Sequence, residues 1–218
     1  YTYTDNGKQK TVKDANGNVA EFIYDGHDRL QKWKFPSKTS VGSVSTTDFE
    51  EYSYDKNGNR ESLRKRDGLT LTYEYDALDR MTKKVVPERT GLAITHTRDV
   101  FYGYDARGLQ TYARFDSASG DGLTTSYDGF GRKASSTLTM DGITKTLGYL
   151  HDKDGNRTQL NWVTDTGYAS YGYDGLDRMK TLFKTVSWTN KLLEFTYNNR
   201  GLLESRTDKY GQVTTYAY

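Results

Sequence analysis

Cysteine is absent from this 218-residue chain, and proline occurs only twice. Without cysteine the chain has no disulfide, no thiolate metal ligand and no cysteine nucleophile. No apolar run approaches the ~18 to 20 residues needed to cross a bilayer, and the opening YTYTDNGKQK lacks the apolar segment of a signal peptide. Because the first residue is not methionine, we expect a fragment of a longer protein.

Charge of one sign is also lacking. The 31 basic and 29 acidic side chains nearly cancel and are scattered along the chain, which argues against nucleic acid or an anionic membrane as a partner. Hydrophobic residues make up only 34%, yet the chain contains 19 tyrosines. This mixture is too aromatic for a disordered chain and too polar for a densely filled globule.

A short motif of tyrosine, aspartate and a later glycine recurs along the chain. Its copies begin at Tyr3, Lys13, Tyr24, Tyr54, Tyr75, Tyr104, Tyr127, His151, Tyr173, Tyr197 and Asp208. From Asp55 onward the motif aspartate, or Asn198 in its place, recurs every 21 to 29 residues. We therefore expect a single repeat array over residues 1–218.

Each motif has the residue types of a tight turn. The aspartate can accept hydrogen bonds from backbone N–H groups two or three residues on, and the glycine three residues later supplies a positive φ. Where glycine is missing, the substitute is Asp28, Asp79 or Asp177, and aspartate is one of the few other residues that tolerates the left-handed region. We assign a structural role to the motif residues Tyr24, Asp25, Tyr54, Asp55, Gly58, Tyr75, Asp76, Tyr104, Asp105, Gly108, Tyr127, Asp128, Gly131, Asp152, Gly155, Tyr173, Asp174, Tyr197 and Gly201.

The segments that flank the turns alternate as β-strands do. Phe22 and Tyr24, or Tyr73 and Tyr75, are two residues apart and so share one face of a strand. A second set of turns, including the Asp-Gly pairs at Asp67 and Asp141, lies between the motifs. The conserved-looking motif should mark one edge of the sheet and variable turns the other.

Two alternating sets of turns predict an all-β fold. We expect a long antiparallel meander of hairpins with very roughly 20 short strands and almost no helix. Because strand twist accumulates, open sheets seldom exceed ~10 strands without curling. The meander should therefore curl into a spiral or shell segment.

These residues resemble the YD-repeat, or Rhs-repeat, family, whose signature is similar to YDxxGR as in Tyr127 to Arg132. The resemblance covers essentially the whole chain. The family includes bacterial polymorphic toxins, the C component of insecticidal toxin complexes and the teneurins. It implies a β-ribbon that spirals into a hollow shell, which in the bacterial members encloses a toxic C-terminal domain. On this basis we expect the parent protein to be secreted or exported from a bacterial cell.

One part of the family pattern is missing. Bacterial shells of this kind usually end in a core segment with Asp-Pro motifs that carries the self-cleavage aspartates. The two prolines here are Pro36 and Pro87, and neither follows an aspartate. Neither self-cleavage nor toxicity can therefore be assigned to a residue of this chain.

Several residues are of types that could serve in catalysis or metal binding. Asp25, Asp55, Asp76, Asp105, Asp128, Asp152 and Asp174 could be glycosidase carboxylates or Ca²⁺ ligands, but a calcium loop needs a dense run of oxygen ligands with a terminal glutamate. The three histidines, His27, His96 and His151, share no metal-ligand spacing. We predict no catalytic residue, no cofactor and no metal.

Two further sets of side chains could bind ligands. Arg29, Arg80, Arg132 and Arg178 follow the turns and could hold acidic ligands, although pairing with the turn aspartates or with neighbouring repeats is favoured. Trp33, Trp162 and Trp188 could stack on sugars, although periodic aromatics more often pack on each other. Asn156 to Thr158 form a glycosylation sequon that matters only in a secretory eukaryote.

The sequence thus predicts a structural, non-enzymatic repeat module in a hollow shell that encloses a toxin domain. Its partners would be the rest of the parent chain and the enclosed toxin, with possible edge-to-edge self-association. The alternative is a cell-surface carbohydrate-binding or adhesion module built on the same repeats.

Overall fold

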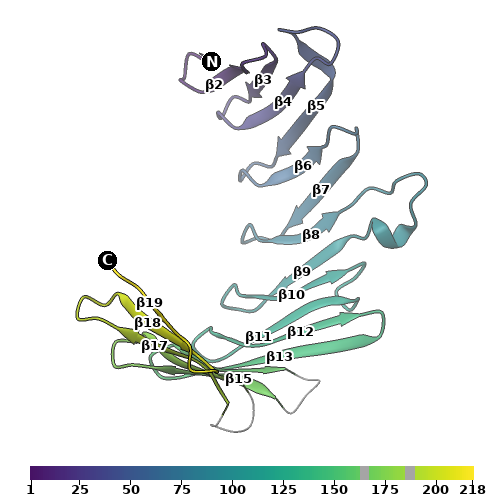
Figure 1. Ribbon diagram of the computed structural model, residues 1–218. Helices are drawn as coiled ribbons and strands as arrows, with labels where there is room; N and C mark the ends of the chain where they lie inside the picture. The colour runs from purple at the N-terminus through teal and green to yellow at the C-terminus, as the bar shows by residue number, and fades with distance from the viewer. Residues whose placement is uncertain (163–166, 185–189) are drawn as a thin grey trace. The chain divides into compact units, whose positions relative to one another are not determined.

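The computed structural model describes residues 1–162, 167–184 and 190–218, and consists of strands joined by turns (Figure 1). Its 19 strands belong to one antiparallel sheet. Each strand pairs with the next along the chain, as in β1 with β2 and β18 with β19. The predicted all-β antiparallel meander is therefore confirmed, and the strand number is close to the expected one.

The strands are short, as the spacing of the turns requires. The first nine are β1 (Thr2–Tyr3), β2 (Gln9–Lys13), β3 (Val19–Tyr24), β4 (Leu30–Pro36), β5 (Val44–Tyr54), β6 (Arg60–Arg64), β7 (Thr70–Tyr75), β8 (Met81–Val85) and β9 (Val100–Tyr104). The others are β10 (Gln110–Phe115), β11 (Gly122–Tyr127), β12 (Lys133–Met140), β13 (Ile143–His151), β14 (Arg157–Trp162), β15 (Tyr168–Tyr173), β16 (Met179–Lys184), β17 (Lys191–Tyr197), β18 (Leu203–Asp208) and β19 (Val213–Thr215).

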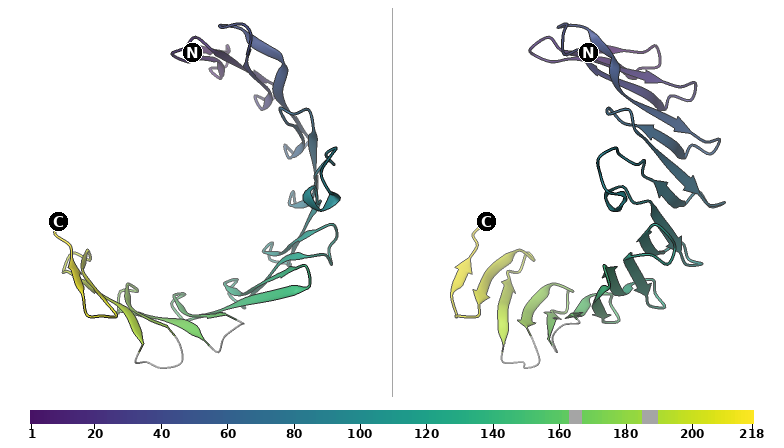
Figure 2. Two further views of the ribbon diagram at one scale, coloured as in Figure 1. Left: turned by 45° about the vertical axis from the view of Figure 1, so that its right-hand side comes forward. Right: turned by 90° about the vertical axis from the view of Figure 1, so that its right-hand side faces the viewer.

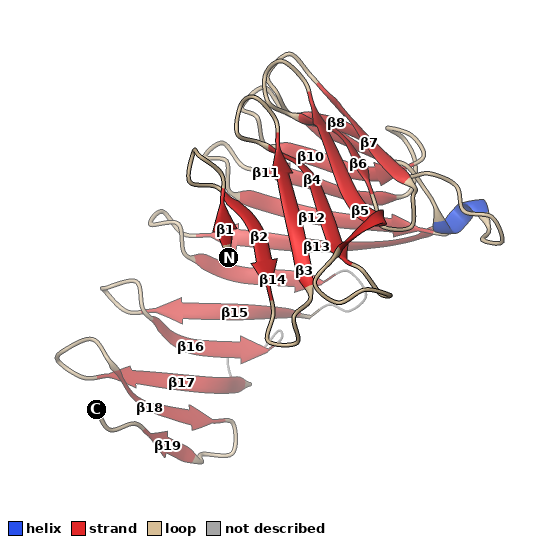
Figure 3. Ribbon diagram, turned by 90° about the horizontal axis from the view of Figure 1, so that it is seen from above, coloured by secondary structure: helices blue, strands red, loops and turns tan. Residues whose placement is uncertain are grey.

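Helix is nearly absent from the described part of the chain, as expected. One 3₁₀ turn, η1 (Ile94–His96), lies in the connection between β8 and β9 (Figure 3). No helix among the described residues is long and apolar enough to cross a membrane.

The chain divides into two compact units. The first comprises Tyr1–Tyr102 with Phe115–Ala118, and the second comprises Gly103–Arg114 with Ser119–Tyr218. Within each unit, strands that follow one another in the sequence lie side by side (Figure 2).

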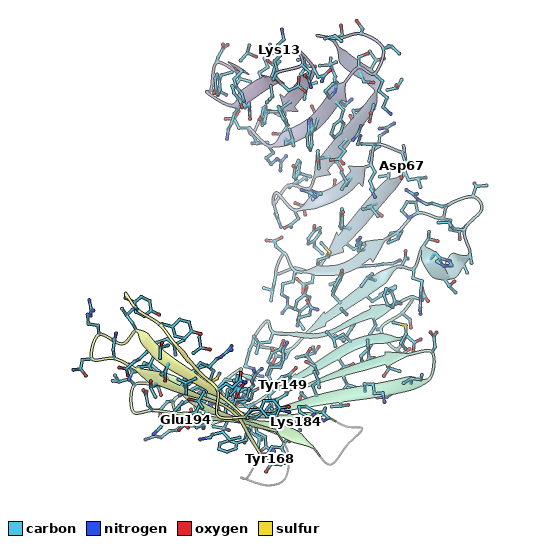
Figure 4. All side chains as sticks on the ribbon, viewed as in Figure 1. Lys13, Asp67, Tyr149, Tyr168, Lys184 and Glu194 are labelled. Atoms are coloured by element: carbon cyan, nitrogen blue, oxygen red, sulfur yellow. The ribbon has the colours of Figure 1, made fainter. Side chains whose placement is uncertain are left out.

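Each unit is a single layer of sheet without a packed core. In the described part of the chain, Ala169 is the buried hydrophobic residue, and no large side chain is fully buried. Side chains project from both sides of the strands (Figure 4). With no second layer to cover either face, ladder hydrogen bonds and contacts between neighbouring strands must provide most of the stability. This explains why the sheet can be stable with few aliphatic residues.

The β3–β4 hairpin carries different side chains on its two faces. On one face Phe22 is paired with Trp33, and their rings stack with centroids 5.6 Å apart. On the other face Lys34 forms an ion pair with Glu21 at 2.8 Å. At this point of the β3–β4 hairpin, the period of two therefore places an aromatic pair and an ion pair on opposite faces.

In the second unit, hydroxyl groups pair across strands on one face. Thr137 of β12 and Thr146 of β13 are directly opposite, and their hydroxyl oxygens are 2.9 Å apart. Ser126 and Ser135 form a similar contact of 2.6 Å between β11 and β12. Such polar cross-strand pairs suit a face that stays in contact with water.

The two Asp-Gly turns are both hairpin connections, but they differ in type. Asp141 and Gly142 have φ of 51° and 76° and connect Met140 directly to its partner Ile143. Positive φ at both central residues is the type I′ arrangement that matches strand twist. At Asp67 only the following Gly68 has a positive φ, because the turn is longer by three residues.

Candidate functional site

The repeated turns are the candidate site, and each has five residues, counted from the motif aspartate. The N–H of the first residue donates to the carbonyl oxygen of the fifth, as in Asp128 to Arg132 at 2.8 Å. The N–H of the fourth donates back to the first carbonyl, as in Gly131 to Asp128 at 3.0 Å. The same two bonds close the turns that begin at Thr4, Asp25, Asp55, Asp76, Asp105, Asp152, Asp174 and Asn198.

The fourth residue of these turns has a left-handed backbone. Gly131 has a φ of 80°, and the substitutes Asp28, Asp79 and Asp177 have φ of 60°, 58° and 58°. Aspartate at these three positions thus adopts the conformation that was expected of it. The strand register also shifts by one residue next to the motif aromatic, as at Tyr54 and Tyr127. A turn that ends in a left-handed residue commonly carries such a bulge.

The carboxylate of the motif aspartate stabilises the turn by accepting backbone hydrogen bonds. One oxygen of Asp128 accepts hydrogen bonds from the N–H groups of Phe130 and Arg132, both at 2.9 Å. The backbone N–H donors therefore lie two and four residues after the aspartate, whereas the sequence predicted donors two or three residues after it. The N–H three residues on is already bonded to the first carbonyl, so it is not available to the carboxylate.

The turns that connect an odd-numbered strand to the next even-numbered strand form what we call the motif side of the sheet. Their first residues are Thr4, Asp25, Asp55, Asp76, Asp105, Asp128, Asp152, Asp174 and Asn198. The copies at Asp14 and Asp208 connect β2 to β3 and β18 to β19, so they lie on the opposite side. The prediction that the motif marks one edge is wrong for these two copies, because strand number and not motif type decides the side.

The motif tyrosines link each hairpin to the preceding one. The Tyr54 hydroxyl donates to the carbonyl oxygen of Leu30 at 2.9 Å. Leu30 is the first residue after the preceding turn. Equivalent bonds of 2.8 to 3.0 Å join Tyr24 to Gln9, Tyr75 to Arg60, Tyr127 to Gln110, Tyr173 to Arg157 and Tyr197 to Met179. His151, which replaces one tyrosine, has no hydroxyl to donate. This link was not predicted from the sequence, although the constant position of each tyrosine directly before its turn was a usable signal.

The arginines that follow the turns contact both their own turn and the next. Arg132 Nε donates to its own Asp128 at 2.7 Å, and its Nη1 donates to the carbonyl oxygen of Asp152 at 2.6 Å. Arg29 pairs with Asp25 at 2.8 Å and lies over the ring of Tyr54 at 4.5 Å from its centroid. Arg80 and Arg178 pair with Asp76 and Asp174 in the same way. These guanidinium groups are thus engaged within the sheet.

The electrostatics of the turns do not suit acid catalysis. Hydrogen bonds from Asn59 and Arg80 lower the pKa of Asp55 and Asp76 below the usual value. Burial raises the pKa of Asp25, Asp105, Asp128 and Asp152, but hydrogen bonds from the turn outweigh it, so each pKa is also lowered. A general acid needs a raised pKa.

Metal binding has no support in the described residues, where no group of three or more His, Asp or Glu side chains could hold an ion. An open depression of about 470 Å³ beside β3 is lined by Tyr3, Phe22 and Asp25 among others. Its Asp25 carboxylate already accepts bonds from His27 and Arg29.

Of the tryptophans that the structure describes, Trp33 is packed against other rings. Trp33 packs against Phe22 and against Phe35, with centroids 4.4 Å apart in the second pair, and the guanidinium of Arg66 lies 3.8 Å above Phe35. Trp162 is paired with Leu147 across strands, and Trp188 lies outside the described residues. The sequon residue Asn156 donates its amide to Asp177 at 2.7 Å, so this nitrogen is in use.

The tyrosine link predicts a measurable loss of stability. Tyr54→Phe or Tyr173→Phe should lower the free energy of unfolding by about 0.5 to 1.5 kcal/mol, because one hydrogen bond to a backbone carbonyl is lost. Urea denaturation followed by circular dichroism measures this. Tyr210→Phe is the matched control, since Tyr210 is 76% exposed. Equal effects in all three variants would contradict the assigned role.

The turn carboxylates predict acid sensitivity. A hydrogen bond from Arg178 lowers the pKa of Asp174 from 3.8 to about 2. Because the folded pKa is the lower one, its stabilising effect is complete above about pH 4 and is lost as the pH falls towards 2. Asp174→Asn keeps an oxygen acceptor, as Asn198 does for Arg200 and Leu202. The urea midpoints of wild type and variant should therefore converge between pH 4 and pH 2.

The reciprocal change Asn198→Asp should add acid sensitivity of the same sign. Arg200 is the third residue of this turn. Arg107 holds the same position in the turn that begins at Asp105, and it pairs with Asp105 at 2.8 Å, so Arg200 is placed to pair with an aspartate at position 198.

The Asp174→Asn experiment also has an outcome that would refute this account of the turn. In that outcome, the difference in urea midpoint between Asp174→Asn and wild type stays constant down to pH 2.

Comparison with known proteins agrees with this geometry. Residues 54–90, which contain the turns at Asp55 and Asp76, match the family model for the RHS Repeat. The crystal structure of TcdB2-TccC3-Cdc42 is similar over 97% of this chain and 12% of that chain, with a TM-score of 0.64 and 17% identity. The crystal structure of TcdB2-TccC3 without the hypervariable C-terminal region is similar over 94% of this chain and 12% of that chain, with a TM-score of 0.63 and 18% identity.

The crystal structure of TcdB2-TccC3-TEV gives a TM-score of 0.60 at 13% identity, over 98% of this chain and 13% of that chain. The chain thus spans about an eighth of the length of the chains it matches. At these identities the likeness concerns the fold. The chain therefore carries an RHS Repeat, as the resemblance of its Tyr-Asp turns indicated, and shares the fold of these toxin-complex structures.

Proposed function

We propose that this chain is a structural, non-enzymatic segment of a hollow β-shell, and that the shell encloses a toxin domain of the same parent protein. The observation that carries the proposal is that the polar groups of the repeated turns are used within the sheet. The carboxylate of Asp128, for example, accepts bonds from Phe130 and Arg132, and Arg132 also contacts the next turn. Residues arranged in this way hold strands together and leave few groups for chemistry.

A role as the wall of a shell also accounts for the single layer of sheet in each unit. A sheet without a core can extend by adding hairpins, since each one needs only its two neighbours. In a long array the strand twist would accumulate and curl the sheet. A partly polar wall would offer an enclosed domain no continuous apolar surface. The full array over residues 1–218, its place in a longer exported bacterial protein and the enclosed cargo are all parts of this proposal.

The carbohydrate-binding alternative has less support. Sugar recognition by stacking needs an exposed ring face beside polar groups. Trp33 instead packs against Phe22 and Phe35, and the guanidinium of Arg66 lies over the Phe35 ring. We therefore retain the shell as the favoured function.

Enclosure can be tested in the full-length parent protein. After treatment with a broad-specificity protease, the toxin domain should remain intact while the shell is closed, and should be digested once denaturant opens the shell. The matched control is the same domain produced without the repeats, which should be digested at once. Equal digestion rates would refute enclosure, and selective binding of this chain on a glycan array would favour the alternative.

The terminal strands generate a second proposal, that the isolated chain associates through its edges. Val213 of β19 is 60% exposed, and residues 212–218 contain no charged side chain to block pairing. We propose antiparallel pairing of β19 with β19 of a second copy, which gives a dimer.

Sedimentation velocity at increasing concentration should show a monomer–dimer equilibrium. Thr214→Lys places a charge on β19 and should shift it towards monomer, whereas Thr137→Lys, on an interior strand, serves as the control for added charge. A monomer at all concentrations would exclude edge association.

A further inference from the structure

The turns on the motif side fall into two classes according to their fourth residue. In one class this residue is aspartate, as at Asp28, Asp79 and Asp177, and in the other it is glycine. Aspartate in the left-handed region is less favourable than glycine. Its presence at three equivalent positions therefore calls for a compensating contact.

The compensating contact comes from an asparagine of the preceding turn. Asn57 Nδ2 and Asn59 Nδ2 both donate to Oδ1 of Asp79 at 2.7 Å. Asn156 donates to Oδ1 of Asp177 at 2.7 Å, and Asn6 donates to Oδ1 of Asp28 at 3.1 Å. All three aspartate-class turns thus receive an amide hydrogen bond from the turn before them.

Three glycine-class turns receive a different donor, an arginine of the preceding turn. Arg107 Nη1 donates to the backbone carbonyl of Asp128, whose turn contains Gly131, at 2.7 Å. Arg132 and Arg29 make the same contact with the turns that contain Gly155 and Gly58, at 2.6 and 3.3 Å. A glycine turn has no carboxylate at its fourth position, so a long guanidinium that reaches the main chain replaces the short amide.

We infer that these side chains are a neighbour-recognition element, in which a turn with a donor asparagine accepts an aspartate-class turn as its neighbour and a turn with a donor arginine accepts a glycine-class turn. The backbone ladder is nearly the same in every hairpin and cannot by itself specify which hairpin lies next to which. The turn side chains add that information, and they disfavour a slip by one whole repeat. This inference concerns the order of repeats and does not depend on an enclosed cargo.

The neighbour-recognition element also accounts for the near-identity of residues 73–81 (YEYDALDRM) and residues 171–179 (YGYDGLDRM). Each contains an aspartate-class turn, and each follows a turn with a donor asparagine, in DKNGN or DKDGN. Two segments that meet the same neighbour chemistry need the same residues at the contact.

A double-mutant cycle tests the contact between Asn57 and Asp79. Hydrogen exchange of the turn at residues 76–80 is measured by mass spectrometry in the wild-type chain, Asn57→Ala, Asp79→Gly and the double variant. Asn57→Ala should speed exchange by about tenfold, since one charge-assisted hydrogen bond is lost. In the Asp79→Gly background the same substitution should have an effect smaller by a factor of about three or more.

The control cycle combines Asn57→Ala with Asp28→Gly. Asp28 has the same backbone conformation, but its amide donor is Asn6, so the two effects should multiply. Multiplicative effects in the Asn57 and Asp79 cycle would overturn the inference, and so would equal coupling in both cycles, which would indicate general cooperativity of the sheet. If Asp79→Gly does not fold, the cycle is carried out on the equivalent pair with Asn156→Ala and Asp177→Gly.

Discussion

The hydrogen-bonded five-residue turn is the interaction on which the rest of this structure depends. In a single-layer sheet no core forms, and Ala169 is the buried hydrophobic residue of the described chain. Stability must then come from interactions between strands that are adjacent in sequence. The turn brings each such pair together, and its first carboxylate fixes the turn through the N–H groups of its third and fifth residues, as Asp128 does for Phe130 and Arg132. Without that closure the flanking strands would lack a defined register.

The unusual composition follows from the same constraint. A side chain on a one-layer sheet is covered by its neighbours on the same face but not by a second layer, so an aliphatic residue gains less there than in a core. Tyrosine is better suited, because its ring covers the neighbouring strand while its hydroxyl reaches a carbonyl group of the preceding hairpin, as Tyr54 does at Leu30. Arginine is used similarly, with its charge on the turn aspartate and its planar surface over a ring, as Arg29 shows with Asp25 and Tyr54.

These contacts also bear on function. Carboxylates, guanidinium groups and rings are the residues from which catalytic and binding sites are built, and this chain repeats them many times. Here they are engaged with one another: the pKa of Asp76 is lowered by a hydrogen bond from Arg80, and Trp33 is packed between strands with Phe22. The likeness to the toxin-complex structures concerns the fold of the sheet.

The sequence by itself determined the local structure. The spacing of Asp and Gly predicted the turns, the alternation of aromatic residues predicted the strands, and together they indicated an antiparallel meander of about the right number of strands. Local patterns sufficed because each turn is closed by residues within five positions of each other, as in Asp128 to Arg132. Only the tertiary structure decided that the copies at Asp14 and Asp208 lie on the opposite side, that Tyr54 bonds to Leu30, and that Asn57 bonds to Asp79. Those contacts join residues of different hairpins, and which atoms meet there depends on strand register, bulges and side-chain reach, which no short stretch of sequence contains.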